Sequence, residues 1–147
     1  MNCCMRNEYL PTRRICLTAR AMSDLTKLGN PDAAADRSLE CFPIDDPGQQ
    51  ITLVCSEFTC RCPITGQPDW ATITIEYGPH ARVVETKSLK LYLETFREVG
   101  IFHEHLITLI RDDLVAALEP RSLRVTADFS SRGGIAVRAS TAFERNS

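Results

Sequence analysis

The sequence of 147 residues has no apolar run long enough to cross a membrane. Arg13, Arg14 and Arg20 interrupt the apolar residues of positions 1–21, so this segment lacks the continuous apolar stretch of a secretory signal. We therefore expect a cytoplasmic protein that does not contact membranes. Its 44% hydrophobic and 24% charged residues are ordinary for one soluble domain with its own core.

Basic residues are not in excess either. The chain has 17 lysine and arginine residues against 19 aspartate and glutamate residues, a formal net charge of −2. Surfaces that bind nucleic acids neutralise phosphates with clustered lysine and arginine. We therefore expect no direct nucleic-acid partner, and any anionic ligand must be met by a local group of cations.

No Cys-x-x-Cys pair occurs in the sequence, although cysteine is found at positions 3, 4, 16, 41, 55, 60 and 62. An odd number of cysteines in a chain without a secretory signal favours free thiols over a disulfide framework. Side chains with the chemistry of zinc ligands are present at Cys55, Cys60, Cys62, His103 and His105. However, Pro63 stiffens the place where a zinc knuckle would bend, so we predict no metal site.

The first 48 residues show little periodicity and contain the turn-forming stretches Gly29–Asp32 and Asp45–Gly48. We interpret residues 1–48 as an N-terminal extension that packs over the domain or stays mobile, and residues 49–147 as the domain itself. Met22 begins a sequence of ordinary soluble character. Translation from Met22 is therefore an alternative start, which would leave residues 1–21 outside the native protein.

Four segments have the pattern of strands. Ile51–Phe58 is rich in β-branched and apolar residues, and Thr72–Tyr77 alternates with a period of two. Leu123–Phe129 and Ile135–Ala139 also alternate, on either side of a glycine-containing turn. We predict two antiparallel hairpins.

Two helices are predicted between the hairpins. The first has Ser88 as its candidate N-cap and Gly100 as its stop, and the second begins at Phe102 and ends before Pro120. The order β-β-α-α-β-β predicts an α+β protein with an antiparallel sheet and both helices on one face. The sheet has two open edges, so closure into a ring of subunits is expected.

Cys62 and Asp69 bound a short, proline-rich loop between the first two strands. A thiol can attack an electrophilic carbon, and a carboxyl group can protonate what forms. The alternative is a buried cysteine beside a turn-forming aspartate. Cys60 lies close to this loop and is expected to be buried rather than to form a reversible disulfide.

Three further segments carry groups that bind ligands. Residues 84–92 place a carboxylate, two amines and hydroxyls at a strand-to-helix junction, where free N–H groups favour an anion such as a cofactor phosphate. His103 and Glu104 lie in the first turn of the second helix, and Arg132 lies in a flexible turn. A capped helix with solvated lysines and a plain hairpin loop are the alternatives.

Together, four motifs resemble the NADPH-dependent 7-cyano-7-deazaguanine reductases, the nitrile reductases of queuosine biosynthesis. These motifs are Cys62-Pro-x-Thr-Gly-Gln-Pro-Asp69, Glu85-Thr-Lys-Ser-Leu-Lys-Leu-Tyr92, Phe102-His103-Glu104 and Arg132-Gly133-Gly134. The resemblance covers residues 50–142 and implies the short, single-module form. It also implies the tunnelling fold that GTP cyclohydrolases share, assembled into a ring-like oligomer, with two stacked pentamers as one form.

The resemblance also implies a role for each site residue. Cys62 is the expected nucleophile, which forms a covalent thioimide with the nitrile carbon, and Asp69 is the expected proton donor, with His103 beside it. Substrate contacts are expected from Val84, Glu85, Thr86, His103 and Glu104. Contacts with NADPH are expected from Lys87, Ser88 and Lys90, with Arg132 and Gly133 as further candidates.

The proposed chemistry sets requirements for the environment of each group. Cys62 must be a thiolate, which Arg61 and His103 are expected to favour. Burial beside Trp70 and the substrate ring is expected to keep Asp69 protonated. A domain this small scarcely encloses both a base and a dinucleotide, so we expect sites between subunits. Two rival functions remain open: a zinc-dependent cyclohydrolase of the same fold acting on a purine or pterin, and a module that only binds a purine-like ligand.

Overall fold

The structure is a computed structural model that describes residues 24–146. The proposed alternative start and the extension before it, residues 1–21, lie outside this range. Within it, no helix has both the length and the apolar character needed to span a membrane.

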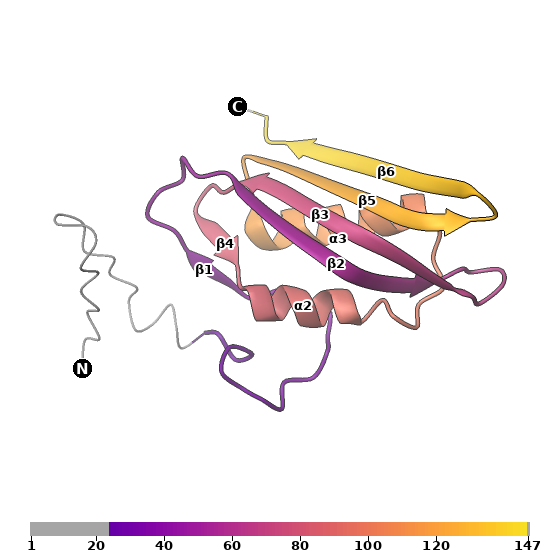
Figure 1. Ribbon diagram of the computed structural model, residues 1–147. Coiled ribbons are helices and arrows are strands. Elements are labelled where there is room, and N and C mark those ends of the chain that lie inside the picture. Colours follow the sequence, from indigo (N-terminus) through magenta and orange to yellow (C-terminus); the bar gives the residue numbers. More distant parts are fainter. Residues whose placement is uncertain (1–23, 147) are drawn as a thin grey trace.

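The main sheet has four antiparallel strands in the order β2-β3-β5-β6 (Figure 1). These are β2 (Ile51–Arg61), β3 (Pro68–Gly78), β5 (Ser122–Arg132) and β6 (Ile135–Glu144). Each is rich in β-branched or alternating residues, which suits a surface with one buried face. The two predicted hairpins are therefore confirmed, and the register places the second strand of one hairpin directly beside the first strand of the other.

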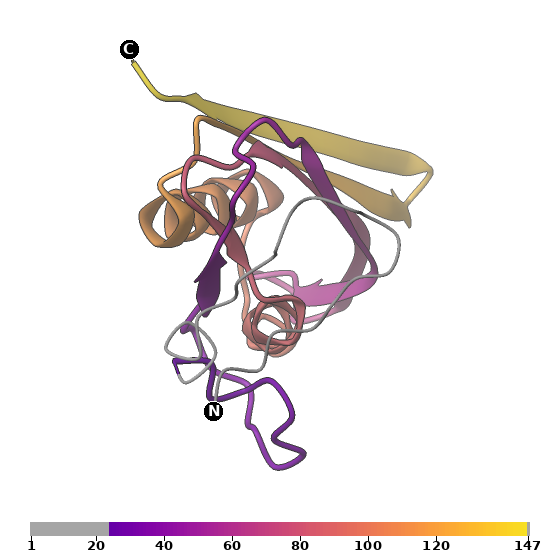
Figure 2. The same ribbon diagram turned by 90° about the vertical axis from the view of Figure 1, so that its left-hand side faces the viewer.

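Helices α2 (Thr86–Glu94) and α3 (His103–Leu118) lie on the same face of the sheet (Figures 1 and 2). Their apolar stripes meet the inward side chains of the central strands, so Ile73, Val125 and Ile110 are each 0% exposed. The predicted α+β arrangement, with both helices on one face of an antiparallel sheet, is confirmed. The buried core between the sheet and the two helices therefore fixes the position of the helices relative to the ends of the strands.

A second, two-stranded sheet was not predicted. It pairs β1 (Cys41–Pro43) with β4 (Arg82–Val84) in antiparallel register. Strands of three residues are too short to show a period of two, so the pattern could not reveal them. Through this pairing the end of the N-terminal segment is joined to the strand that leads into α2.

Helix α2 begins earlier than predicted. Its N-cap is Glu85, whose carboxylate accepts the backbone N–H groups of Lys87 and Ser88, both at 2.8 Å. The prediction of Ser88 as the N-cap is wrong, because Ser88 lies inside the first turn and is 0% exposed. The helix also ends at Glu94 rather than near Gly100, since the following N–H groups bond to carbonyls three residues back, as Val99 does to Phe96.

The segment before β1 packs on the start of α2. The Ser88 hydroxyl accepts the Glu40 N–H at 2.7 Å and donates to the Ser38 carbonyl at 3.3 Å. Lys27 is 5% exposed, and its amine donates to the Ser38 carbonyl and to Asp36. Ser88 therefore binds the chain's own N-terminal segment.

We predict that Glu85→Ala lowers the free energy of unfolding by about 1–2 kcal/mol, because it removes both acceptors of a buried N-cap. Urea unfolding followed by circular dichroism measures this. Glu94→Ala is the matched control, since Glu94 is exposed at the other end of the same helix. Equal effects of the two substitutions would show that the cap is not stabilising.

Candidate active site

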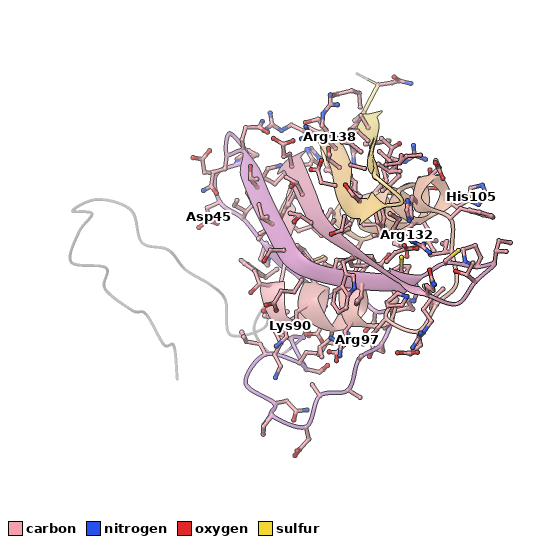
Figure 3. The ribbon with its side chains drawn as sticks, turned by 45° about the vertical axis from the view of Figure 1, so that its right-hand side comes forward. Asp45, Lys90, Arg97, His105, Arg132 and Arg138 are labelled. Atoms are coloured by element: carbon pink, nitrogen blue, oxygen red, sulfur yellow. The ribbon has the colours of Figure 1, made fainter. Side chains whose placement is uncertain are left out.

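One end of the main sheet brings together side chains from four elements. Cys62 follows β2, Asp69 begins β3, His103 begins α3 and Arg132 ends β5. In Figure 3, Arg132 lies beside the strands at this end. The sequence separates these residues by up to 70 positions, and the sheet order brings them to one place because β3 lies between β2 and β5.

A tight loop presents the Cys62 thiol. The Cys62 N–H donates to the Gln67 carbonyl at 2.8 Å, and the Gly66 N–H donates to the Cys62 carbonyl at 2.9 Å. Gly66 has a φ of 68°, a conformation that glycine adopts without strain. These bonds turn the chain back toward β3 and leave the N–H groups of Ile64 and Thr65 directed at the sulfur.

The loop lowers the pKa of Cys62 to about 7. The Thr65 hydroxyl contributes most, followed by the N–H groups of Thr65 and Ile64, and Arg132 adds to the effect. Arg61 was expected to help the thiolate, but its guanidinium binds Glu98 and the Gly66 carbonyl. Arg61 thus braces the loop that holds the sulfur.

Asp69 is buried at the base of this loop, with 3% of its surface exposed. Arg132 Nη1 lies 2.6 Å from its Oδ1, and His103 Nε2 lies 3.4 Å from its Oδ2. Its burial was expected to come from Trp70, but Trp70 is 56% exposed and lies on the opposite face of β3. Burial of Asp69 comes instead from the core face of the sheet and from the Arg132 and His103 side chains.

The His103 imidazole has a fixed orientation. It stacks on Phe129, with ring centroids 3.5 Å apart and an angle of 9° between the planes. Its neighbour Glu104, in the first turn of α3, is exposed to solvent, and Phe102 before it is 49% exposed. A substrate at this end would therefore meet an aromatic ring, an imidazole and an accessible carboxylate.

Cys60 is 0% exposed and lies opposite Asp69 in the β2–β3 register. Burial, and then the charges of Asp69 and Cys62, raise the pKa of Cys60 to about 11. The prediction that Cys60 is buried is confirmed, and its thiol is free. The two neighbouring thiols therefore differ in reactivity, because the thiolate is the reactive form.

The predicted substrate and cofactor residues of 84–90 lie elsewhere. The Val84 N–H donates to the Tyr77 hydroxyl at 3.3 Å, so the start of α2 lies near the Gly78 end of β3. Between Asp69 and Gly78 the strand is ~30 Å long. Within one chain, Val84, Glu85 and Thr86 therefore do not meet Asp69.

Several of the predicted contacts on α2 are already occupied. The Glu85 carboxylate caps the helix, Ser88 binds Ser38 and Glu40, and the Lys87 amine donates to the Asn30 carbonyl. Lys90 is exposed and lines a groove. Gly133 lies in the β5–β6 turn beside Arg132, far along the sheet from Lys90.

The groove between β2 and α2 was not predicted. It has a volume of about 560 Å³ and apolar walls that include Leu53, Phe58 and Leu93. Lys90 and Arg97 line it as cations, and Figure 3 shows both on the α2 side of the molecule. The sequence did not indicate Arg97 as a ligand-binding residue, because Arg97 lies after the end of α2 and outside the four motifs. The carboxylates of Glu57 and Glu94 also line the groove, so the two cations are balanced by two anions, and the apolar walls suit a ligand with flat rings.

The proposed zinc ligands do not assemble. Among residues 24–146, no group of three or more histidine, cysteine, aspartate or glutamate side chains is placed to hold a metal ion.

The fold resembles that of a solved structure, an archaeosine synthase QueF-Like in its apo form. The TM-score is 0.62 with 24% identity, over 67% of this chain and 95% of the other. Fold and site together define an α+β protein with two helices on one face of an antiparallel sheet, whose candidate site centres on the Cys62 thiol.

Sequence comparison gives the family. A family model described as QueF-like protein matches residues 68–147. A reductase of Frankia casuarinae, named NADPH-dependent 7-cyano-7-deazaguanine reductase, is 73% identical over 121 residues, which are 82% of this chain and 97% of the relative. One of the same name from Syntrophus aciditrophicus is 48% identical, over 84% of this chain and 89% of the relative. The chain belongs to this family of NADPH-dependent reductases, as the four motifs predicted.

We predict that Cys62 reacts with iodoacetamide at a rate that depends on pH, because only the thiolate reacts. The rate should be half-maximal near pH 7 and should decrease further at lower pH. Thr65→Val removes the strongest donor and should raise this midpoint by about one pH unit. Peptide mass spectrometry follows Cys62 separately from the other cysteines.

Thr52→Val is the control for the Thr65 substitution, because Thr52 is exposed at the far end of β2. Its midpoint should equal that of the unchanged protein. A wild-type midpoint near 8.5, the value of an ordinary thiol, would contradict the assignment.

Proposed function

We propose that the protein reduces the nitrile of 7-cyano-7-deazaguanine to give 7-aminomethyl-7-deazaguanine, at the expense of two NADPH, in queuosine tRNA-modification biosynthesis. The observation that carries this proposal is the Cys62 thiol, held among hydrogen-bond donors beside the buried Asp69. The family relationship supports it. Location in the cytoplasm and the lack of direct nucleic-acid contact remain predictions.

Cys62 makes the nitrile reactive toward hydride. Its thiolate adds to the nitrile carbon and forms a C–S bond, while one C–N π bond breaks and Asp69, which must first take up a proton, gives that proton to the nitrogen. The product on Cys62 is a thioimide. His103, 3.4 Å from Asp69, is placed to return a proton to the carboxylate.

NADPH, when bound, supplies the hydride for each of the two reductions. After the first, the carbon attached to Cys62 bears hydrogen, nitrogen and sulfur, and expulsion of the thiolate leaves an imine. The second hydride and a further proton give the amine. The sum is one nitrile, two NADPH and two protons, giving one amine and two NADP⁺, and the Cys62 thiolate is regenerated.

Recognition of the base is proposed for Glu104 and His103, with Val84 and Thr86. The exposed Glu104 carboxylate can accept a pair of N–H groups from the base, which a neutral side chain matches less well. Because the Glu85 carboxylate is committed to the helix cap, we propose that this residue helps by holding Val84 and Thr86 in place.

Cofactor binding is proposed for the groove between β2 and α2. Lys90 lines it and is exposed, and Arg97 adds a second cation. Lys87, in the first turn of α2, is proposed to meet phosphate when its bond to Asn30 opens. Ser88 supports the same site indirectly, since it anchors the N-terminal segment to α2.

The site is proposed to lie between subunits of a ring, with two stacked pentamers as one arrangement. The ~30 Å of β3 separates the two halves of the site in one chain, so a second copy must bring Val84 and Thr86 to Cys62. Large apolar side chains are exposed around the Cys62 end, namely Ile64, Trp70, Phe102 and Ile135. In the described part of the chain, β2 and β6 are the edges of the main sheet. Both features favour association.

We predict that adding the cyano base to the protein with excess NADPH consumes two NADPH for each base, measured as loss of near-ultraviolet absorbance. Cys62→Ala should abolish this activity, because no thioimide can form. A metal chelator should leave it unchanged. Chelator-sensitive turnover without loss of NADPH would instead indicate the cyclohydrolase. If the protein catalyses neither reaction, it is a binding module.

A site between subunits predicts complementation. Cys62→Ala and Lys90→Ala chains, each with little activity alone, should recover activity when co-expressed, since about a quarter of the sites in a random equal mixture carry both native residues. NADPH consumption by the purified mixed oligomer measures this.

Co-expression of Cys62→Ala with Asp69→Asn is the matched control. These two residues lie at the same end of one chain, so no mixed site has both native residues, and activity should stay low. Absence of recovery in the first mixture, although mass spectrometry shows mixed oligomers, would refute the shared site.

A further inference from the structure

Arg132 is held at the end of β5 by the turn that follows it. Gly133 and Gly134 have φ values of 57° and 81°, which a two-residue hairpin turn requires and glycine adopts without strain. Beyond the pair Ala71–Phe129, the antiparallel register of β3 and β5 leads Arg132 to the first residues of β3. The turn and the sheet together therefore aim Arg132 at Asp69.

The Arg132 guanidinium binds two groups of the Cys62 loop region. Nη1 donates to Asp69 Oδ1 at 2.6 Å, and Nη2 donates to Gln67 Oε1 at 2.6 Å. The planar fork of arginine fixes the relative position of two acceptors in a way that a single amine cannot. Gln67 is also the residue whose carbonyl accepts the Cys62 N–H, so the fork links the loop to the buried carboxylate.

Arg132 also forms a hydrogen bond to the Cys62 side chain, which is the largest reason why its own pKa is raised. Cys60 on β2 and Arg132 on β5 interact electrostatically with Cys62, and Asp69 on β3 interacts with both of them. His103 on α3 lies against Asp69 at 3.4 Å. A thiolate beside the Asp69 carboxylate would be repelled by it. In the substrate-free protein, before Asp69 takes up the proton that it donates, the Arg132 guanidinium bonds to this carboxylate and offsets the repulsion.

We propose that Arg132 is a positioning residue that holds Asp69 and the Cys62 loop in register and stabilises the thiolate, rather than a ligand of the cofactor phosphates. Both of its terminal nitrogens are engaged at 2.6 Å in the protein itself. The kinetic part of this proposal rests on the proposed reductase function, whereas its effect on the thiol does not.

The test compares Arg132→Met and Arg132→Lys with the unchanged full chain. Without any substrate, the pH midpoint of Cys62 alkylation should rise by about one unit in Arg132→Met, because the stabilising charge is lost. Arg132→Lys should give a smaller rise, since it keeps the charge but not the fork. With substrates, kcat should fall at least tenfold in Arg132→Met, while KM for NADPH stays within twofold.

Arg138→Ala is the control, because Arg138 pairs with Asp128 on the same hairpin and its side chain is 74% exposed. It should change neither the midpoint nor the kinetic constants. If Arg132→Met does not fold, as circular dichroism would show, Arg132→Lys and Gln67→Leu carry the same test of the midpoint and kcat.

An unchanged alkylation midpoint together with a large rise in KM for NADPH would overturn the proposal and make Arg132 a cofactor ligand. An unchanged midpoint with unchanged kinetics would overturn it as well. If Arg132→Met raises the alkylation midpoint but the unchanged protein has no nitrile reductase activity, the positioning role is upheld and the proposed function is rejected. The two failures are thus distinguishable.

Discussion

The buried carboxylate of Asp69 is the point on which the candidate site depends. It lies on β3, receives Arg132 from β5 at 2.6 Å and faces His103 from α3 at 3.4 Å. Removal of one partner from such a buried group is costly, because the remaining charge is left without compensation. The carboxylate thus couples the positions of three elements, and the Cys62 loop lies directly at their junction. The position of the Cys62 sulfur therefore depends on how β3, β5 and α3 pack around Asp69.

A second constraint is the length of the strands. The Cys62 end and the start of α2 lie ~30 Å apart because β3 extends between them. This separation explains why residues that the family motifs associate with one substrate fall into two groups within a single chain. In the shared site that we propose, the two groups come from different copies, so catalysis would depend on assembly.

The sequence predicted the long elements well, because the β-branched and apolar residues of β2 and the alternation in β3 and β5 extend over many residues. It failed where local preference and tertiary contacts disagree. Serine is common at N-caps, yet Glu85 caps α2 and Ser88 is drawn inward to bind Glu40. Reactive residues such as Cys62 were recognisable from their motifs. The contact between Arg132 and Asp69 was not, because it depends on which strands are neighbours in the sheet.

The central claim is that Cys62 forms a covalent bond to the nitrile carbon, and mass spectrometry of the intact protein tests it most directly. The protein is incubated with 7-cyano-7-deazaguanine in the absence of NADPH, so that the reaction stops at the thioimide. The account predicts a mass increase of one base per chain, located at Cys62 and absent in Cys62→Ala. No adduct on the unchanged protein, or an equal adduct on Cys62→Ala, would contradict it.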